Sequence, residues 1–214
     1  MEKNTVIYKG EKYELLLQEK DGMFHPEVFG MAPIWMQSRE FSYIGTYKIE
    51  EYQLYLESFL VHTDSSYPTI QNVEAVMSKE EDGKIYAGYY NLSYALNYTG
   101  AIVIAKDFVK DYEIEENFPC FCYTHVVELI FEKGILVTTI AHDKAMVRIR
   151  KNLEKGIRTL RKAKDSRCIR KFIKSSFVGK YNESSLKRGW KLTKRNVMKA
   201  VNKVSHQKNR KVIE

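Results

Sequence analysis

The chain has 214 residues, of which 44% are hydrophobic, and a formal net charge of +8. This composition can fill a folded core and excludes an intrinsically disordered protein. No run of about 18 apolar residues occurs, which argues against a membrane-spanning helix. The first residues do not resemble a signal peptide, and three cysteines do not make a disulfide framework, so we expect a cytoplasmic protein.

Residues 5–140 alternate between short β-prone segments and turns. The clearest turns are Lys9-Gly10-Glu11, Glu50-Glu51 and Glu132-Lys133-Gly134, each between two strand-like segments. Roughly eight strands of this length predict an antiparallel β sandwich or a barrel-like domain. We expect the tyrosines between Tyr86 and Tyr98 to pack in this sheet rather than to stack on bases.

Charge divides the chain near residue 142. Residues 1–142 have a net charge of −11, whereas residues 143–214 have a net charge of +19. We therefore expect an acidic antiparallel β domain over 1–142 and a basic helical region over 143–214. A region this basic requires nearby anions, which nucleic acid, an anionic membrane or the acidic half of the chain can supply.

The best-defined helix of the basic region runs over 144–164, and Asp143 suits its N-cap. Apolar residues recur along it at steps of three and four from Met146 to Leu160, and cations recur in the same way on the opposite face. Further amphipathic patterns predict helices over 165–177 and 193–206. The fold class expected is therefore α+β, with a β sandwich or barrel followed by a basic three-helix region.

The cations of these three helices, and two more between the second and the third, are candidate contacts to phosphate groups. Such contacts make binding salt-dependent and largely independent of base sequence, and we identify no base-reading residue. The candidates are Arg148, Lys151, Lys155, Arg158, Lys162, Arg167, Arg170, Lys171, Lys174, Lys187, Arg188, Lys194 and Arg195.

Three stretches resemble strand motifs of a known group of proteins. The segment from Tyr43 to Leu56, YIGTYKIEEYQLYL, resembles the GTW-x-I-x-DGKLYL hairpin of a group of uncharacterised bacterial β-rich proteins. Residues 98–104 and 127–137 resemble its W-x-SG-x-x-x-IP and E-L-x-L-x-I-x-x-G-x-L-V elements. Tyr47 and Tyr98 replace the Trp residues of that group. The resemblance covers roughly residues 40–140 and implies a β-rich bacterial fold, but no activity.

One cluster contains residue types that bind metals, namely Cys120, Cys122 and His125. On a strand the two cysteines would face one side and the histidine the other, so we expect buried cysteines and no metal site. His142-Asp143 is explained as a strand end followed by an N-cap. Because GxSxG, phosphate-loop and HExxH motifs are absent, we expect neither an enzyme nor a cofactor.

Two hypotheses about function remain open. The first is a bacterial cytosolic, non-enzymatic binding module whose basic helical tail contacts nucleic acid, either DNA or RNA. The alternative is an immunity-type or assembly-type interaction module whose tail docks on an acidic protein or on its own β domain. Peripheral membrane contact is less favoured, because the apolar face of the first helix lacks bulky aromatic residues. The sequence leaves the oligomeric state open.

Overall fold

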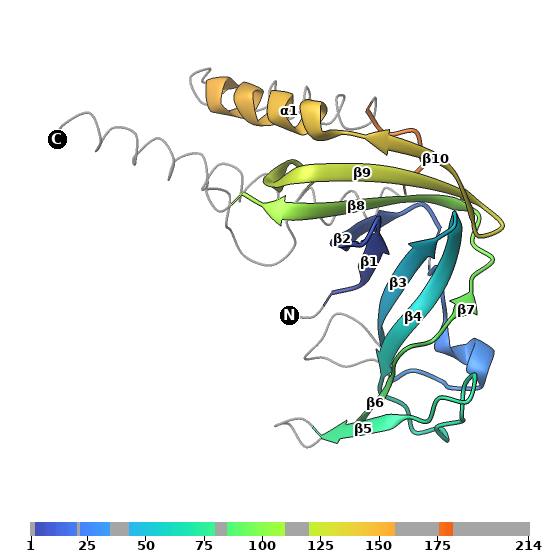
Figure 1. Cartoon of the computed structure of the whole chain (residues 1–214). Helices are drawn as coiled ribbons and strands as arrows, with labels where there is room; N and C mark the ends of the chain where they lie inside the picture. Colours follow the sequence, from blue (N-terminus) through green and yellow to red (C-terminus); the bar gives the residue numbers. More distant parts are fainter. Residues whose placement is uncertain are drawn as a thin grey trace. The chain divides into compact units, whose positions relative to one another are not determined.

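The computed structural model describes residues 3–20, 22–34, 43–79, 85–109, 120–156 and 176–181, with only the backbone for 152–156. Its strands are β1 (Thr5–Tyr8), β2 (Glu11–Gln18), β3 (Tyr43–Glu50), β4 (Gln53–Val61), β5 (Val76–Lys79), β6 (Ile85–Tyr89), β7 (Tyr94–Ala95), β8 (Gly100–Phe108), β9 (Tyr123–Glu132) and β10 (Ile135–Ala141). The helical elements are two 3₁₀ turns, η1 (Pro26–Phe29) and η3 (Cys120–Cys122), and one α-helix, α1 (Asp143–Gly156) (Figure 1).

The strands of the described part form a large mixed sheet. Its hydrogen-bonded order is β10-β9-β8-β2-β1-β3-β4-β6-β5, and both β7 and β10 also pair with β4, the latter through Ile135 and Gln53. The sheet is mixed because β1 pairs antiparallel with β2 but parallel with β3. The prediction of an antiparallel sandwich or barrel is therefore wrong. Strand β3 is separated from β2 by residues 19–42 of the sequence and pairs with β1 in the parallel direction.

The prediction of a three-helix C-terminal region is also wrong, since the described part contains one α-helix and no three-helix region. The first expected helix is present as α1 (Asp143–Gly156), and residues 157–164 of that prediction lie outside the described residues. The expected helix over 193–206 and most of the one over 165–177 lie outside the described residues. Of the second expected helix, Ser176 and Phe177 are described: Ser176 is helical and Phe177, its expected end, is not.

The chain divides into two compact units, which are described separately. The first unit comprises Met1–Leu15, Lys20–Gly100 and Ile130–Thr138. Its core is aromatic: the rings of Phe59 on β4 and Tyr89 on β6 stack with centroids 4.8 Å apart, and Tyr47 is buried. Among the clustered tyrosines, Tyr86, Tyr89 and Tyr98 are buried, which confirms that most of them pack in the sheet.

Two hairpin turns of the first unit lie where the sequence predicts them. Strands β3 and β4 pair antiparallel up to Glu50 and Gln53, on either side of the turn at Glu51 and Tyr52. The turn between β9 and β10 lies at Lys133 and Gly134, both with positive φ. The Gly134 N–H donates to the Tyr98 carbonyl at 2.7 Å, so this turn is held against the chain that leads into β8.

The second unit comprises Leu16–Glu19, Ala101–Leu129 and Thr139–Glu214. Its strands are the end of β2 from Leu16 to Gln18, the buried stretch of β8, which includes Ile102 and Ile104, the adjoining part of β9 and the end of β10. Helix α1 follows β10 directly and contacts η3. The second unit therefore contains both the start of the basic region and the strands on which it packs.

Candidate functional site

Helix α1 is attached at its first turn to strand β9. The Met146 N–H donates to the His142 carbonyl at 2.9 Å, so His142 is the residue that precedes the helix. Asp143 is the first helical residue, and its carboxylate accepts hydrogen bonds from the Val126 N–H at 2.9 Å and from His125 Nδ1 at 3.1 Å. The prediction that Asp143 is an N-cap therefore needs correction: its side chain holds the helix to the sheet, and its charge also suits the positive end of the helix dipole.

One side of α1 is buried in the second unit. Met146 and Ile149, two of the predicted apolar residues, are only 1% and 3% exposed. Arg150 Nη1 donates to the carbonyls of Phe121 and Tyr123 at 2.7 and 2.8 Å. These contacts fix which face of α1 points away from the sheet.

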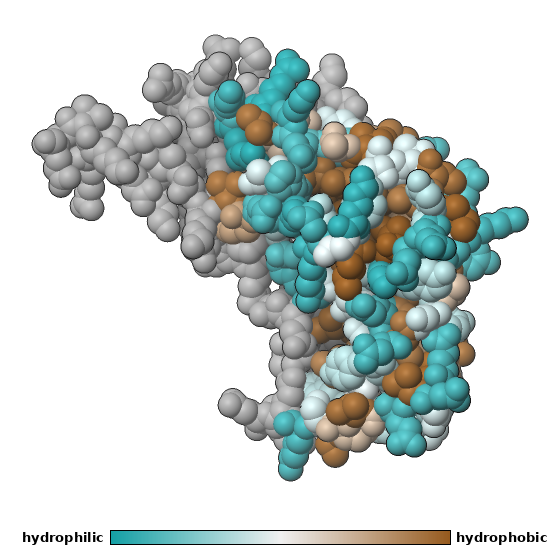
Figure 2. All heavy atoms as spheres, viewed as in Figure 1, coloured by the Kyte–Doolittle hydropathy of each residue, from teal (hydrophilic) through white to brown (hydrophobic). Residues whose placement is uncertain are grey.

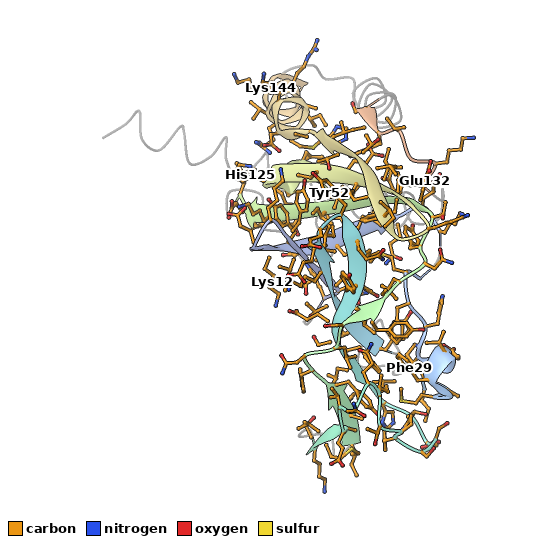
Figure 3. The ribbon with its side chains drawn as sticks, turned by 45° about the vertical axis from the view of Figure 1, so that its right-hand side comes forward. Lys12, Phe29, Tyr52, His125, Glu132 and Lys144 are labelled. Atoms are coloured by element: carbon orange, nitrogen blue, oxygen red, sulfur yellow. The ribbon has the colours of Figure 1, made fainter. Side chains whose placement is uncertain are left out.

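The outward face of α1 carries a row of cations, which we call the cation row: Lys144, Arg148 and Lys151. All three are exposed and are spaced four and three residues apart, so the row is about 10 Å long at 1.5 Å per residue. Within the described ranges, none of the three has an ion-pair partner. Figure 2 shows hydrophilic side chains over α1, and Lys144 is labelled on it in Figure 3.

The structure describes only part of the predicted phosphate-binding set. Arg148 and Lys151 are exposed on α1, and Lys155 lies on the same helix with only its backbone described. Lys144 was not among the predicted candidates, although it precedes Arg148 by one helical turn. The remaining candidates lie outside the described residues: Arg158, Lys162, Arg167, Arg170, Lys171, Lys174, Lys187, Arg188, Lys194 and Arg195.

A buried carboxylate, Glu128 of β9, is fully hydrogen-bonded within the second unit. It is 0% exposed, and its Oε2 lies 3.0 Å from His142 Nε2. Its Oε1 accepts hydrogen bonds from the Gly179 N–H at 2.7 Å and the Tyr181 hydroxyl at 2.8 Å, and the Val178 N–H lies 3.1 Å from both oxygens. Because a carboxylate can only accept, Nε2 of His142 carries the proton.

Three of these four donors come from one short segment, Ser176–Tyr181, which we call the strap. Its next amide, the Lys180 N–H, donates to Glu19 Oε1 at 3.0 Å. Three consecutive strap amides are thus held by two carboxylates of the second unit, Glu128 and Glu19. The strap also lies so close to β8 that a Cβ on Gly179 would be 2.6 Å from the Ala101 Cβ. This part of the basic region therefore docks on the chain's own β strands.

A local signal for Glu128 is present in the sequence. Glu128 interrupts the apolar run from Val126 to Phe131, and a charged residue in a buried strand requires partners. Its partners could not be inferred, because they lie 14 and about 50 residues further along the chain.

The hydrogen bonds decide the ionisation of Glu128. Burial raises the pKa of its carboxyl, but the hydrogen bonds from His142, Gly179, Val178 and Tyr181 together lower the pKa below the ordinary 4.5. Glu128 is therefore a carboxylate at neutral pH. Burial raises the pKa of the Tyr181 hydroxyl, and the negative charge of Glu128 raises it further.

Acid is expected to remove the stabilisation that Glu128 provides. Because its folded-state pKa lies below the unfolded value, the network stabilises the fold above the ordinary pKa of 4.5 and loses this effect as the pH falls below it. We expect the difference in urea midpoint between the wild type and Glu128→Gln to shrink from about pH 7 to about pH 3. A difference that stays constant over this range would show that Glu128 does not titrate as the structure requires.

The predicted cysteines do not lie on a strand: Cys120 and Cys122 form the 3₁₀ turn η3. Burial raises the pKa of the Cys120 thiol to about 12 and that of Cys122 further, so both are protonated at neutral pH. His125 instead bonds to Asp143, and its Nε2 lies 3.6 Å from Asp107. Among the described residues, no group of three or more side chains could hold a metal ion.

Comparison with known proteins assigns neither a family nor a function to the chain. No protein-family model, no curated protein and no solved structure matches the chain. The resemblance of residues 40–140 to bacterial β-rich proteins therefore stays a prediction. Within the described part, no helix is long and apolar enough to cross a membrane.

Proposed function

We propose that the protein is a non-enzymatic module that binds nucleic acid through phosphate contacts to the cation row of α1. The observation that carries this proposal is the division of α1 into two faces. Met146 and Ile149 are buried against the sheet, whereas Lys144, Arg148 and Lys151 are exposed and without ion-pair partners in the described part.

The spacing of the row suits a polymer of phosphates. Double-stranded DNA carries one charge per about 1.7 Å of its axis, so several phosphates fall within the length of the row. Cations of this kind contact the backbone and carry no base information, so we expect little sequence preference. The high charge of residues 143–214, +19, would add attraction over a longer range.

The docked strap favours a second candidate, in which the basic region is an interaction module for acidic protein surfaces. The strap, however, meets Glu128 and Glu19 through backbone N–H groups and the Tyr181 hydroxyl rather than through its lysine. Docking on the chain's own strands therefore leaves the cation row unpaired within the described residues. This favours an external anion as the partner of α1.

The test is fluorescence polarisation of labelled double-stranded DNA and single-stranded RNA against the full chain and a triple variant, Lys144→Gln, Arg148→Gln and Lys151→Gln. If each cation neutralises one phosphate, the variant should lower the slope of log affinity against log salt on DNA by about 3. A matched control changes three exposed lysines elsewhere in the described part, Lys12→Gln, Lys79→Gln and Lys133→Gln. Equal losses in the two variants would mean that net charge matters and the row does not.

A further inference from the structure

Glu128 connects two segments that are far apart in the sequence. One of its oxygens, Oε2, receives the hydrogen bond from His142, the residue whose carbonyl accepts the Met146 N–H in the first turn of α1. The other oxygen, Oε1, receives the Gly179 N–H and the Tyr181 hydroxyl of the strap. The start of the basic helix and the strap therefore share one buried anion.

A second contact joins the same two segments directly. The ring of Phe177 in the strap packs edge-on against the ring of His142, with centroids 4.6 Å apart. If the strap leaves, His142 loses this contact, and Glu128 keeps His142 as its remaining donor among the residues described. A buried carboxylate without most of its donors is costly, so the residues around Glu128 would have to rearrange.

We propose that the strap is a latch that fixes the first turn of α1 through Glu128 and His142. When the strap is docked, α1 is held in the orientation that presents the cation row. When it is released, the first turn loosens and the row is no longer held in one arrangement. The effect on binding rests on the proposed phosphate contacts, whereas the effect on the first turn does not.

Docking of the strap and binding of DNA to the cation row must influence each other equally. If docking of the strap favours binding of DNA to the row, then DNA must stabilise the docked strap by the same factor. Hydrogen exchange of the strap amides measures docking without any reference to binding, because the N–H groups of Val178 and Gly179 are bonded only when the strap is in place.

Gly179 offers a way to open the latch without touching Glu128, His142 or any cation. A side chain there meets the Ala101 Cβ at 2.6 Å and the Tyr181 ring at 2.9 Å, so Gly179→Val should displace the strap. The neighbouring Val178→Ala is the matched control, since Val178 is 65% exposed and its hydrogen bonds to Glu128 use only its N–H. Phe177→Ala is a milder second variant. It removes the Phe177 ring that packs against His142 but keeps the backbone of the strap.

The experiment is hydrogen exchange of the full chain, read at the amides of Val178, Lys180 and Met146, together with polarisation of labelled double-stranded DNA at low salt. We expect Gly179→Val to speed exchange at all three amides and to weaken DNA binding by about tenfold, a usual size for coupling between sites. Phe177→Ala should change the same readouts in the same direction but less, and Val178→Ala should change none of them.

Several results would overturn the latch. Faster exchange in the strap of Gly179→Val with unchanged exchange at Met146 would show that the two segments are independent. If Gly179→Val does not fold, unchanged exchange at Met146 in Phe177→Ala leads to the same conclusion. Absence of DNA binding by the wild type would contradict the proposed function instead, and the exchange data would still decide the latch.

Discussion

Replacing Glu128 with glutamine is expected to lower the free energy of unfolding by about 3–5 kcal/mol, the usual cost of breaking a buried charged network. The glutamine amide has one acceptor oxygen, whereas the carboxylate accepts from His142, two strap amides and Tyr181. Its NH₂ group would also face donor groups where it needs acceptors. The measurement is urea unfolding at neutral pH.

The matched control lies on the same strand. Glu132 is exposed at the end of β9, and Glu132→Gln should change the free energy of unfolding by less than about 0.5 kcal/mol, as is usual at the surface. If Glu128→Gln were equally mild, Glu128 would not hold the strap in the way that the distances indicate.

Replacing Gly134 with alanine is expected to be comparably damaging in the first unit. Gly134 has a φ of +84°, and a Cβ there would lie 1.9 Å from the Leu96 carbonyl oxygen and 2.7 Å from Gln53 Nε2. Backbone cannot yield as a flexible side chain can, so we expect a loss of about 3 kcal/mol or more in the free energy of unfolding, as for strain added to a tight contact.

Gly10→Ala separates the cost of the positive φ from the cost of the steric contact, the two causes of the loss expected in Gly134→Ala. Gly10 has a similar φ of +78°, but nothing lies within 4 Å of its Cβ position. It should therefore show only the left-handed backbone cost of about 1–2 kcal/mol. Thermal or urea unfolding of both variants gives the comparison, and equal losses would contradict the close approach of Leu96 to Gly134.

Local signals were enough to predict the hairpins. The turns at Glu51 and at Lys133-Gly134 lie between alternating apolar segments that pair with their sequence neighbours. The parallel pairing of β1 with β3 has no such signal, because it depends on a long connection without a regular period. This is why the antiparallel sandwich or barrel was the wrong expectation.

The cation row and the buried apolar side of α1 were largely predictable, since both follow from helical periodicity. The apolar period located Met146 and Ile149 correctly, and the opposite period located Arg148 and Lys151. Arg150 was not predicted to be structural, although a cation one turn after Met146 flanks the buried face and needs acceptors there. The strap was missed because most of its donor atoms are backbone N–H groups, which any residue except proline supplies.

The most direct test of the phosphate-contacting role of α1 is the salt dependence of nucleic-acid binding by the full chain, measured by polarisation with labelled double-stranded DNA. Three phosphate contacts predict that affinity falls about fortyfold between about 50 and about 200 mM salt, with little dependence on DNA sequence. Binding of this kind that loses most of its salt dependence in the triple variant Lys144→Gln, Arg148→Gln and Lys151→Gln would support α1 as a phosphate-contacting helix. No binding at the lower salt concentration would contradict it and direct the search to acidic proteins.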